Sequence, residues 1–262
     1  MNYYNLISMM PKAPAIVYDA DAQAFITATG ISGTNASAIN TLVLDLKSAS
    51  IWTKMKAIYP MVGGTATTHK FNLKDPRDLD AAYRLVFNGG WTHSTNGALP
   101  NGTNGYASTF LIPNTVFGAG FAAIGTYVNQ AATIAGRTIG STNMDILVNT
   151  SFMRGANKAS TNTTIVAALP LDGFNVNSRT LSNSTFMMNR AGTFGIGAIT
   201  AVANYATVSD IVLGANNSNG TIGSYTNGRI ALAFCGDFIT TAESTILKTI
   251  VQTYQTTLGR QV

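Results

Sequence analysis

Residues 227–259 read NGRIALAFCGDFITTAESTILKTIVQTYQTTLG, and this stretch carries the clearest structural signal in the chain. An Asn-Gly turn leads into Arg229–Gly236, a run apolar enough for a central strand. Thr240 and Glu243 then have the spacing of a capping box, in which each side chain accepts a hydrogen bond from the other residue's backbone amide. One face of the following helix, 240–258, is apolar until Gly259 ends it: Ile246, Leu247, Ile250, Val251, Tyr254 and Leu258.

Upstream of this strand and helix, the apolar runs are short and turn signals are frequent. Asp80–Phe87 is a strand candidate that leads into the Asn88-Gly89 turn. Further strand candidates are 106–112, 121–128, 144–152, 163–169, 184–190, 193–202 and 207–213. Spacing of this kind, with Asn-Gly turns and without long helices in between, predicts an antiparallel β-sandwich or jelly roll over residues 63–262.

The first 62 residues differ from the rest and predict a helical or extended N-terminal arm. Residues 20–29 have a short helical pattern that Gly30 stops, and Asn35 or Ser37 can cap a second helix. Residues 51–59 have apolar positions that suit one face of a helix or an irregular arm. Near the terminus, apolar side chains either pack on the chain's own sandwich or contact a neighbouring copy: Tyr3, Tyr4, Leu6, Ile7, Met9 and Met10.

Charge is scarce in this chain. Residues 85–136 hold no Asp, Glu, Lys or Arg, and charged residues make up 10% of the 262, against about 25% in average globular proteins. The chain has 35 Thr and 24 Asn, which favour strands and turns respectively. The scattered bases that give a net charge of +5 argue against a nucleic-acid partner. No apolar run is long enough to predict a membrane span, and no signal peptide is evident.

The sequence does not favour an enzyme. Hydrolysis of a glycosidic bond needs two carboxylates, and the single Glu of the chain, Glu243, reads as a helix cap. His69 and His93 lie apart in the sequence with no shared motif, which argues against a lyase cluster. Cys235 sits in an apolar run and reads as a small buried residue. The Gly-rich segment 192–197 lacks the Lys-Ser/Thr of a phosphate-binding loop, so no cofactor is expected.

The acidic segment Asp75, Asp78 and Asp80 offers oxygen ligands of the kind calcium prefers. It lacks the Asp-x-Asp-x-Asp-Gly spacing, however, and Arg77 would repel a cation. We therefore expect a structural turn in which Arg77 pairs with a nearby carboxylate, and no metal site.

Carbohydrate binding is the functional alternative that the residues themselves support. Aromatic rings stack on the apolar faces of sugars, while amides and hydroxyls bond the sugar hydroxyls. The candidate glycan contacts are aromatic and polar residues in Asn- and Gly-rich segments: Trp91, His93, Asn96, Tyr106 and Tyr225. Trp91 also directly follows a predicted strand, so packing at the sandwich edge is the favoured interpretation of that residue and glycan contact the alternative.

Three segments resemble a group of bacteriophage virion proteins from Bacteroidetes-type phages. They are YDADAQAFITATGI at 18–31, AINTLVLDLKSASIWTKMKAIYPMVGGTATTHKFNLKDPRDLDAAYRLVF at 38–87, and RIALAFCGDFITTAESTILKTIVQTYQTTLGR at 229–260. The resemblance covers residues 15–112 and 225–260 and does not extend to the variable middle. It implies a concanavalin A-like (laminin-G-like) jelly roll.

The resemblance also implies a role and a location. It points to a non-enzymatic structural protein of the virion, such as a capsid decoration, head fibre or tail-associated subunit. Its partners would be copies of itself and other virion proteins, assembled in the host bacterial cytoplasm. A glycan-binding adhesion or receptor-recognition module on a fibre or spike is the alternative.

Overall fold

The structure is a computed structural model that describes residues 17–262 except 119, 149–151, 158–162, 167–171, 182–183, 190, 193, 199–203 and 206–207. The predicted assembly contacts Tyr3, Tyr4, Leu6, Ile7, Met9 and Met10 lie outside the described residues.

Helices occur mainly near the two ends of the described chain. They are α1 (Ala20–Thr29), α2 (Gly33–Ser48), α3 (Ala66–His69), α4 (Pro113–Phe117) and α5 (Thr241–Thr257), with two 3₁₀ turns, η3 (Trp52–Lys54) and η4 (Asp80–Ala82). The capping box predicted for α5 is present: Thr240 Oγ1 accepts from the Glu243 amide at 3.2 Å, and Glu243 Oε2 accepts from the Thr240 amide at 2.8 Å. No helix within the described residues combines the length and apolar character that a bilayer crossing requires.

The strands form two sheets. The first has the order β13-β12-β11-β6-β17-β4-β3, and β1 also pairs with β17; the second has the order β10-β9-β8-β7-β14-β5-β2, with β15 paired with β7 and β16 paired with β15. Their bounds are β1 (Met55–Tyr59), β2 (Val86–Asn88), β3 (Trp91–Ser94), β4 (Gly97–Pro100), β5 (Tyr106–Ser108), β6 (Ala122–Gln130), β7 (Gly136–Ser141), β8 (Met144–Val148), β9 (Phe152–Gly155), β10 (Thr163–Val166), β11 (Gly173–Leu181), β12 (Ser184–Met188), β13 (Phe194–Ala198), β14 (Val212–Leu213), β15 (Asn216–Ser218), β16 (Thr221–Gly223) and β17 (Arg229–Asp237).

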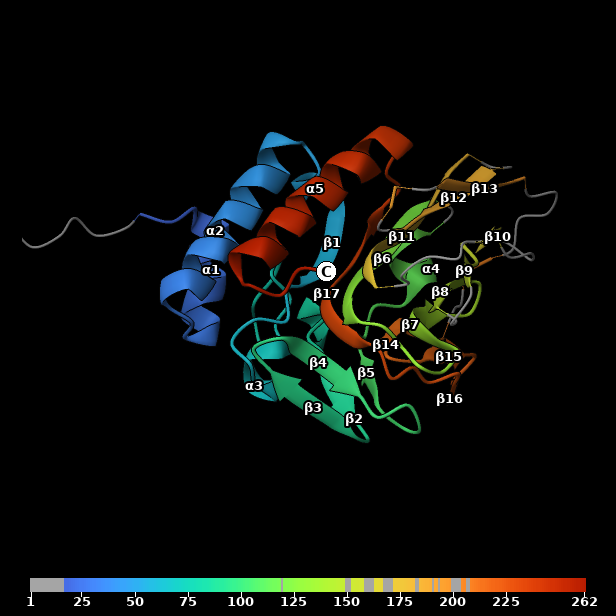
Figure 1. The fold of residues 1–262 in the computed structure, drawn as a ribbon, viewed down its shortest axis with the longest axis horizontal. Coiled ribbons are helices and arrows are strands. Elements are labelled where there is room, and N and C mark those ends of the chain that lie inside the picture. The colour runs from blue at the N-terminus through green and yellow to red at the C-terminus, as the bar shows by residue number, and fades with distance from the viewer. Residues whose placement is uncertain are drawn as a thin grey trace, which may run out of the picture.

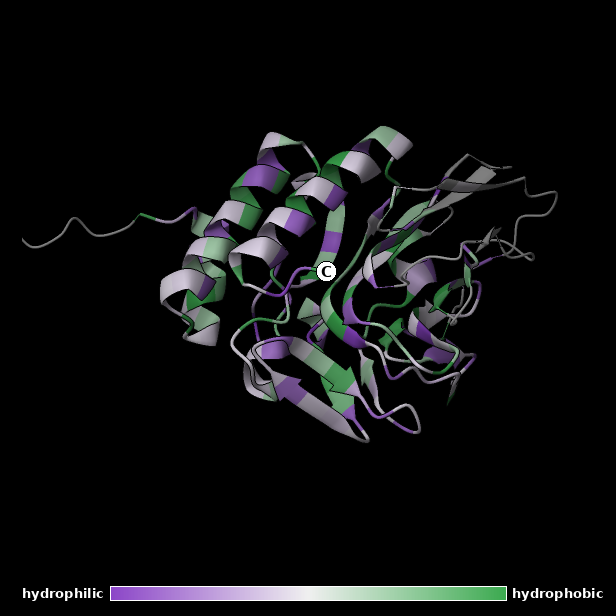
Figure 2. Cartoon of the chain, in the orientation of Figure 1, coloured by the Kyte–Doolittle hydropathy of each residue, from purple (hydrophilic) through white to green (hydrophobic). Residues whose placement is uncertain are grey.

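The molecule has three layers, with α1, α2 and α5 on one side of the first sheet and the second sheet on the other (Figure 1). Strand β17 is central, as its sequence predicts, because it pairs with β6, β1 and β4. Leu232 and Phe234 face the helices, while Ala233 and Cys235 face the second sheet. Along α2 and α5, apolar and polar positions alternate, as expected for helices with one buried face (Figure 2).

The expectation for residues 51–59 was wrong, because Met55–Tyr59 form strand β1 within the first sheet. Met55 and Ile58 face the helices, whereas Ala57 and Tyr59 enter the core between the sheets. A strand buried on both faces is apolar at nearly every position, so its pattern mimics a helix face. The predicted division of the chain at residue 62 stays a prediction, although β1, on its N-terminal side, pairs with β17.

Other element boundaries also differ from those predicted. Asp80–Phe87 is not one strand: η4 comes first, Tyr83 has a left-handed backbone with φ of 59°, and β2 begins only at Val86. Helix α2 begins at Gly33, earlier than the predicted caps at Asn35 or Ser37. Strands β7 and β11 have no counterpart among the sequence candidates, since Asn, Arg and Gly interrupt their apolar residues.

A buried guanidinium near the chain end joins the layers. All five N–H groups of Arg260 have acceptors: Nε donates to Gln255 Oε1 at 2.6 Å, and the terminal nitrogens donate to four carbonyls, those of Pro60, Met61, Thr95 and Ala231, at 2.7–3.2 Å. These acceptors belong to α5, the segment after β1, the β3–β4 turn and β17. Arg260 is 4% exposed, and burial lowers the pKa of its guanidinium.

We expect replacement of Arg260 by Lys or Met to destabilise the fold strongly. Lysine keeps the charge but cannot present five donors in a fixed plane, and methionine leaves buried carbonyls without donors. The expected loss in the free energy of unfolding is about 3 kcal/mol, from urea titration followed by circular dichroism. The matched control is Arg77→Met, which removes an exposed pair with Asp75 and should leave the unfolding midpoint unchanged. Equal midpoints for Arg260→Met and Arg77→Met would contradict this role.

Candidate functional site

The β3–β4 hairpin forms one edge of the first sheet and carries three of the predicted glycan contacts. Trp91 pairs with Pro100, and Ser94 pairs with Gly97 across the turn. Gly97 lies so close to β17 that an added Cβ would meet the Ile230 carbonyl at 2.4 Å, and its φ is 122°. A side chain at position 97 would clash with the neighbouring strand β17, so this position requires glycine.

A shallow hollow lies at the end of this hairpin away from the turn. Its lining residues are Gly90, Trp91, Thr92, Leu99, Pro100 and Asn101. Trp91, Leu99 and Pro100 supply apolar surface and Thr92 supplies a hydroxyl, while the Asn101 amide is bonded mainly within its own loop. Every lining residue is uncharged, because the hollow lies inside the charge-free stretch 85–136. An apolar floor with neutral polar groups at its rim suits a neutral, hydroxyl-rich ligand.

The loop beside the hollow is held rigid by its own side chains. Asn101 Oδ1 accepts the amide hydrogens of Thr103, Asn104 and Gly105 at 3.0–3.1 Å. Asn101 Nδ2 donates to Asn104 Oδ1 at 2.8 Å, and the Gly90 amide donates to the same oxygen at 3.1 Å. The rim is thus ordered before any ligand arrives, which reduces the entropy lost on binding.

Trp91 is mainly a packing residue at the edge of this hollow. Its indole Nε1 donates to the carbonyls of Asn88 and Tyr106 at 3.1 and 3.2 Å. Its ring packs edge-on against Phe87 with centroids 5.2 Å apart, and a Cβ at Gly214 would lie 3.0 Å from it. Trp91 therefore ties β3 to the second sheet and offers the hollow only the part of its ring that remains half-exposed.

The two histidines lie together, contrary to the expectation drawn from their separation in the sequence. His69 Nδ1 and His93 Nδ1 are 2.9 Å apart, and His69 Nε2 accepts the Gly64 amide at 3.2 Å. His69 is 1% exposed; burial, His93 and Arg260 together lower its pKa to about 3. Burial also lowers the pKa of His93. No sequence motif signals this pair, because it forms only when α3 packs beside the hairpin.

The other predicted glycan contacts lie in three separate places. Tyr106 is half-buried in β5, with its carbonyl bound by Trp91. Tyr225 is half-buried, and its hydroxyl donates to the Ile222 carbonyl at 3.4 Å. Asn96 is exposed in the hairpin turn, at the opposite end from the hollow, where its carbonyl accepts from Asn129 at 2.7 Å. Sequence reasoning did not identify four of the residues that line the hollow: Thr92, Leu99, Pro100 and Asn101.

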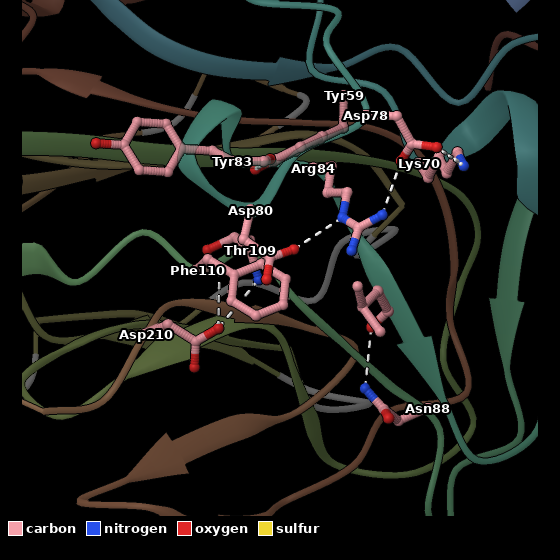
Figure 3. A network of polar contacts seen from close by, with 11 residues as sticks. Tyr59, Lys70, Asp78, Asp80, Tyr83, Arg84, Asn88, Thr109, Phe110 and Asp210 are labelled. Atoms are coloured by element: carbon pink, nitrogen blue, oxygen red, sulfur yellow. Dashed lines mark hydrogen bonds and ion pairs between the residues drawn. The ribbon is translucent and has the colours of Figure 1, made fainter.

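The acidic segment is a network of ion pairs. Arg77 pairs with Asp75, as predicted, and Lys70 pairs with Asp78. Arg84 bridges Asp78 and Asp80 at 2.9 and 2.8 Å (Figure 3). Within the described residues, no group of three or more His, Cys, Asp or Glu side chains could hold a metal ion. The carboxylates of this segment are thus committed to cationic side chains.

Figure 3 also shows Phe110, which lies near this network. It follows β5, in the part of the second sheet where β2, β5 and β14 are neighbours. Phe110 is 37% exposed and has a φ of 58°, a conformation that costs about 1–2 kcal/mol for an L-residue. Asp210 offsets this cost, since its Oδ2 accepts the amides of Thr109 and Phe110 at 3.1 and 3.0 Å. The ring of Phe110 is thereby held in a fixed, partly exposed position.

Cys235 and Glu243 are of residue types that often take part in catalysis, but both have structural roles in this protein. Cys235 is buried between the sheets, and burial raises the pKa of its thiol to about 12, which keeps it protonated. Glu243 closes the capping box of α5 and also accepts from Lys54 Nζ at 2.6 Å.

No protein-family model and no curated protein sequence matches this chain. Solved structures do. A structure of botulinum neurotoxin type C, concerned with its interaction with two ganglioside molecules, matches 78% of this chain and 53% of its own, at 10% identity and a TM-score of 0.52. The binding domain of botulinum neurotoxin DC, in complex with rat synaptotagmin II, matches 77% of this chain and 53% of its own, at 10% identity and a TM-score of 0.51. A mutant Trypanosoma rangeli sialidase with trans-sialidase activity matches 82% of this chain and 39% of its own, at 11% identity and a TM-score of 0.51.

This chain spans about half or less of the length of those proteins. At such low identity the likeness concerns the fold alone. Two stacked sheets, N-terminal helices and a C-terminal helix agree with the class predicted from the sequence. The chain is therefore a mainly β protein with the concanavalin A-like, lectin-like sandwich fold.

Proposed function

We propose that this protein is a non-enzymatic glycan-binding module whose site is the hollow at the base of the β3–β4 hairpin. The observation that carries the proposal is the lining of that hollow, an apolar floor of Trp91, Leu99 and Pro100 beside the ordered Asn101 loop. The fold adds support, since a neurotoxin with the same sandwich interacts with gangliosides and another neighbour is a sialidase.

The chemistry of the hollow narrows the class of sugar. Its lining residues include no Lys or Arg that could pair with a sialic acid carboxylate. Its hydroxyl and amide groups suit the hydroxyls of a neutral saccharide, and its apolar residues suit the C–H face of a pyranose ring. We therefore propose neutral glycans as ligands.

The proposal excludes catalysis on the same residues. A glycosidase needs two carboxylates that flank the sugar bond, and the lining of the hollow contains none. Glu243, the single Glu of the chain, is occupied by a helix cap and by Lys54.

A change at Thr92 tests the site without disturbing the core, because this residue is exposed and lines the hollow. Thr92→Trp should fill the hollow and weaken binding of a neutral glycan, identified on an array, at least about tenfold by calorimetry. The control is Thr27→Trp on the exposed face of α1, which should bind like the wild type. Undiminished binding by Thr92→Trp, or an array that shows only sialylated ligands, would contradict the proposal.

We also propose that the module belongs to a phage particle. The resemblance of residues 15–112 and 225–260 to virion proteins supports this role. So does the exposed face of α5, an uncharged ridge of Thr241, Thr245, Thr249, Thr253 and Thr257. Three of these hydroxyls donate to the carbonyl four residues earlier, those of Thr245, Thr249 and Thr257, so the ridge presents mainly methyl groups. Such a face can pack against neighbouring subunits with little dependence on salt.

The assembly proposal predicts that deletion of residues 1–14 lowers the oligomeric state and leaves the sandwich folded. If the apolar side chains of this segment contact neighbouring copies, their removal should give smaller assemblies in native mass spectrometry. The control replaces only Lys12 by Gln and should assemble normally. A deletion variant that assembles like the full chain would contradict the role of this segment, and absence of the protein from purified particles would contradict the virion location.

A further inference from the structure

The His69–His93 pair joins two elements that otherwise make few contacts. His69 is the last residue of α3, a helix of one turn, and His93 lies in the middle of β3. The loop before α3 supplies the Gly64 amide, and a Cβ at Gly64 would lie 3.1 Å from the Thr95 amide in the hairpin turn. The two rings therefore link the loop and α3 to the hairpin that carries the hollow.

The hydrogen bonds fix the protons of this pair. Because Gly64 N–H donates to His69 Nε2, the proton of neutral His69 is on Nδ1. That proton points to His93 Nδ1 at 2.9 Å, so neutral His93 carries its own proton on Nε2. Both ring lone pairs are then occupied as acceptors. Any additional proton must displace one of the two N–H donors and break a hydrogen bond.

The surroundings do not favour a charged pair. Arg260, from the chain end, contributes a positive charge and donates to the Thr95 carbonyl at 3.2 Å in the same hairpin. Phe87, from β2, packs edge-on against His93 with centroids 4.5 Å apart, and Trp91 stacks on the same ring at 6.2 Å. The groups that face the pair from α3, β2, β3 and the chain end are thus apolar or cationic.

We propose that the His69–His93 contact is an acid-sensitive latch. It holds the β3–β4 hairpin against α3 and the loop before it at neutral pH, and a proton taken up by either ring breaks this contact and loosens the hairpin. The inference about the latch stands on the hydrogen bonds alone. Its consequence for ligand release rests on the proposed glycan hollow.

The direction of the pH effect follows from the folded-state pKa values, both of which are lowered. Histidine in an open or unfolded segment has a pKa of about 6.5, so the open state takes up protons first as the pH falls. The hairpin is fully stabilised above that pH and loses stability below it, down to the folded-state pKa of about 3 for His69. Within this window, opening that takes up one proton becomes about tenfold more populated for each unit of pH.

The chain contains two histidines, so every imidazole signal belongs to this pair. Nitrogen-15 NMR of the full chain should show a protonated Nδ1 on His69 and a protonated Nε2 on His93 at neutral pH. The His69 signal should titrate at a pH well below the ordinary histidine range, and the pKa of His93 should also be lowered. Mixed tautomers, or a titration near pH 6.5 for both rings, would overturn the latch.

Hydrogen exchange of the hairpin amides 92–99 tests whether protonation of the histidine pair loosens the hairpin. The matched control is the double variant His69→Gln, His93→Gln. At position 69 a glutamine amide can accept a hydrogen bond from Gly64 and donate one to residue 93. A glutamine at position 93 can accept that hydrogen bond, and neither glutamine titrates. Wild-type hairpin amides should lose protection in acid relative to the double variant, which shares the pH dependence of intrinsic exchange. Equal profiles would overturn the proposal.

If the double variant does not fold, the NMR titration of the wild type decides alone. Neither measurement involves a sugar, so failure of the latch and failure of the glycan proposal are distinguishable. Where a neutral glycan binds, its affinity should fall in acid in the wild type and hold in the double variant His69→Gln, His93→Gln. Equal losses in both proteins would separate ligand release from the latch and overturn that consequence.

Discussion

The arrangement of the layers depends on the side chain of Arg260. A helix layer and a sheet can slide past each other when only apolar side chains join them, because hydrophobic contact has no direction. The Arg260 guanidinium supplies direction, since its five donors lie in one plane and meet acceptors from four separate segments. It thereby fixes where the β3–β4 hairpin lies relative to β17 and α5. Its charge has a second effect, because it helps to keep the neighbouring His69 neutral.

The scarcity of charge is consistent with the way this sandwich is built. Polar side chains in its interior are mostly amides and hydroxyls that bond within the fold. Asn157, for example, donates to the carbonyls of Ala122 and Asn177 and accepts from Tyr205. Neutral groups of this kind carry a smaller desolvation cost than ions when they are buried. The same neutral chemistry continues to the surface at the hollow, whose lining residues are all uncharged.

Local signals in the sequence predicted part of this molecule. The capping box of α5, the central strand β17 and the Asn-Gly turns are encoded within a few residues, and all were visible. Strand β1 was misread because it is buried on both faces, so its apolar pattern does not reveal a period of two. At the candidate site, Trp91 was identified, but its indole N–H binds Asn88 and Tyr106, a contact set by sheet packing. The histidine pair could not be predicted, since 24 residues separate its members.

The position of β17 also has a consequence for synthesis. Its neighbours β1, β4 and β6 are translated long before it, and β17 lies between β6 and β4 in the first sheet. During elongation the ribosome therefore releases those strands without the partner that joins them, and their edges and apolar faces stay unpaired until β17 emerges. The first sheet can close only after residues 229–237 have been translated. A cell that makes this protein must keep the earlier strands from aggregating until β17 and α5 follow them.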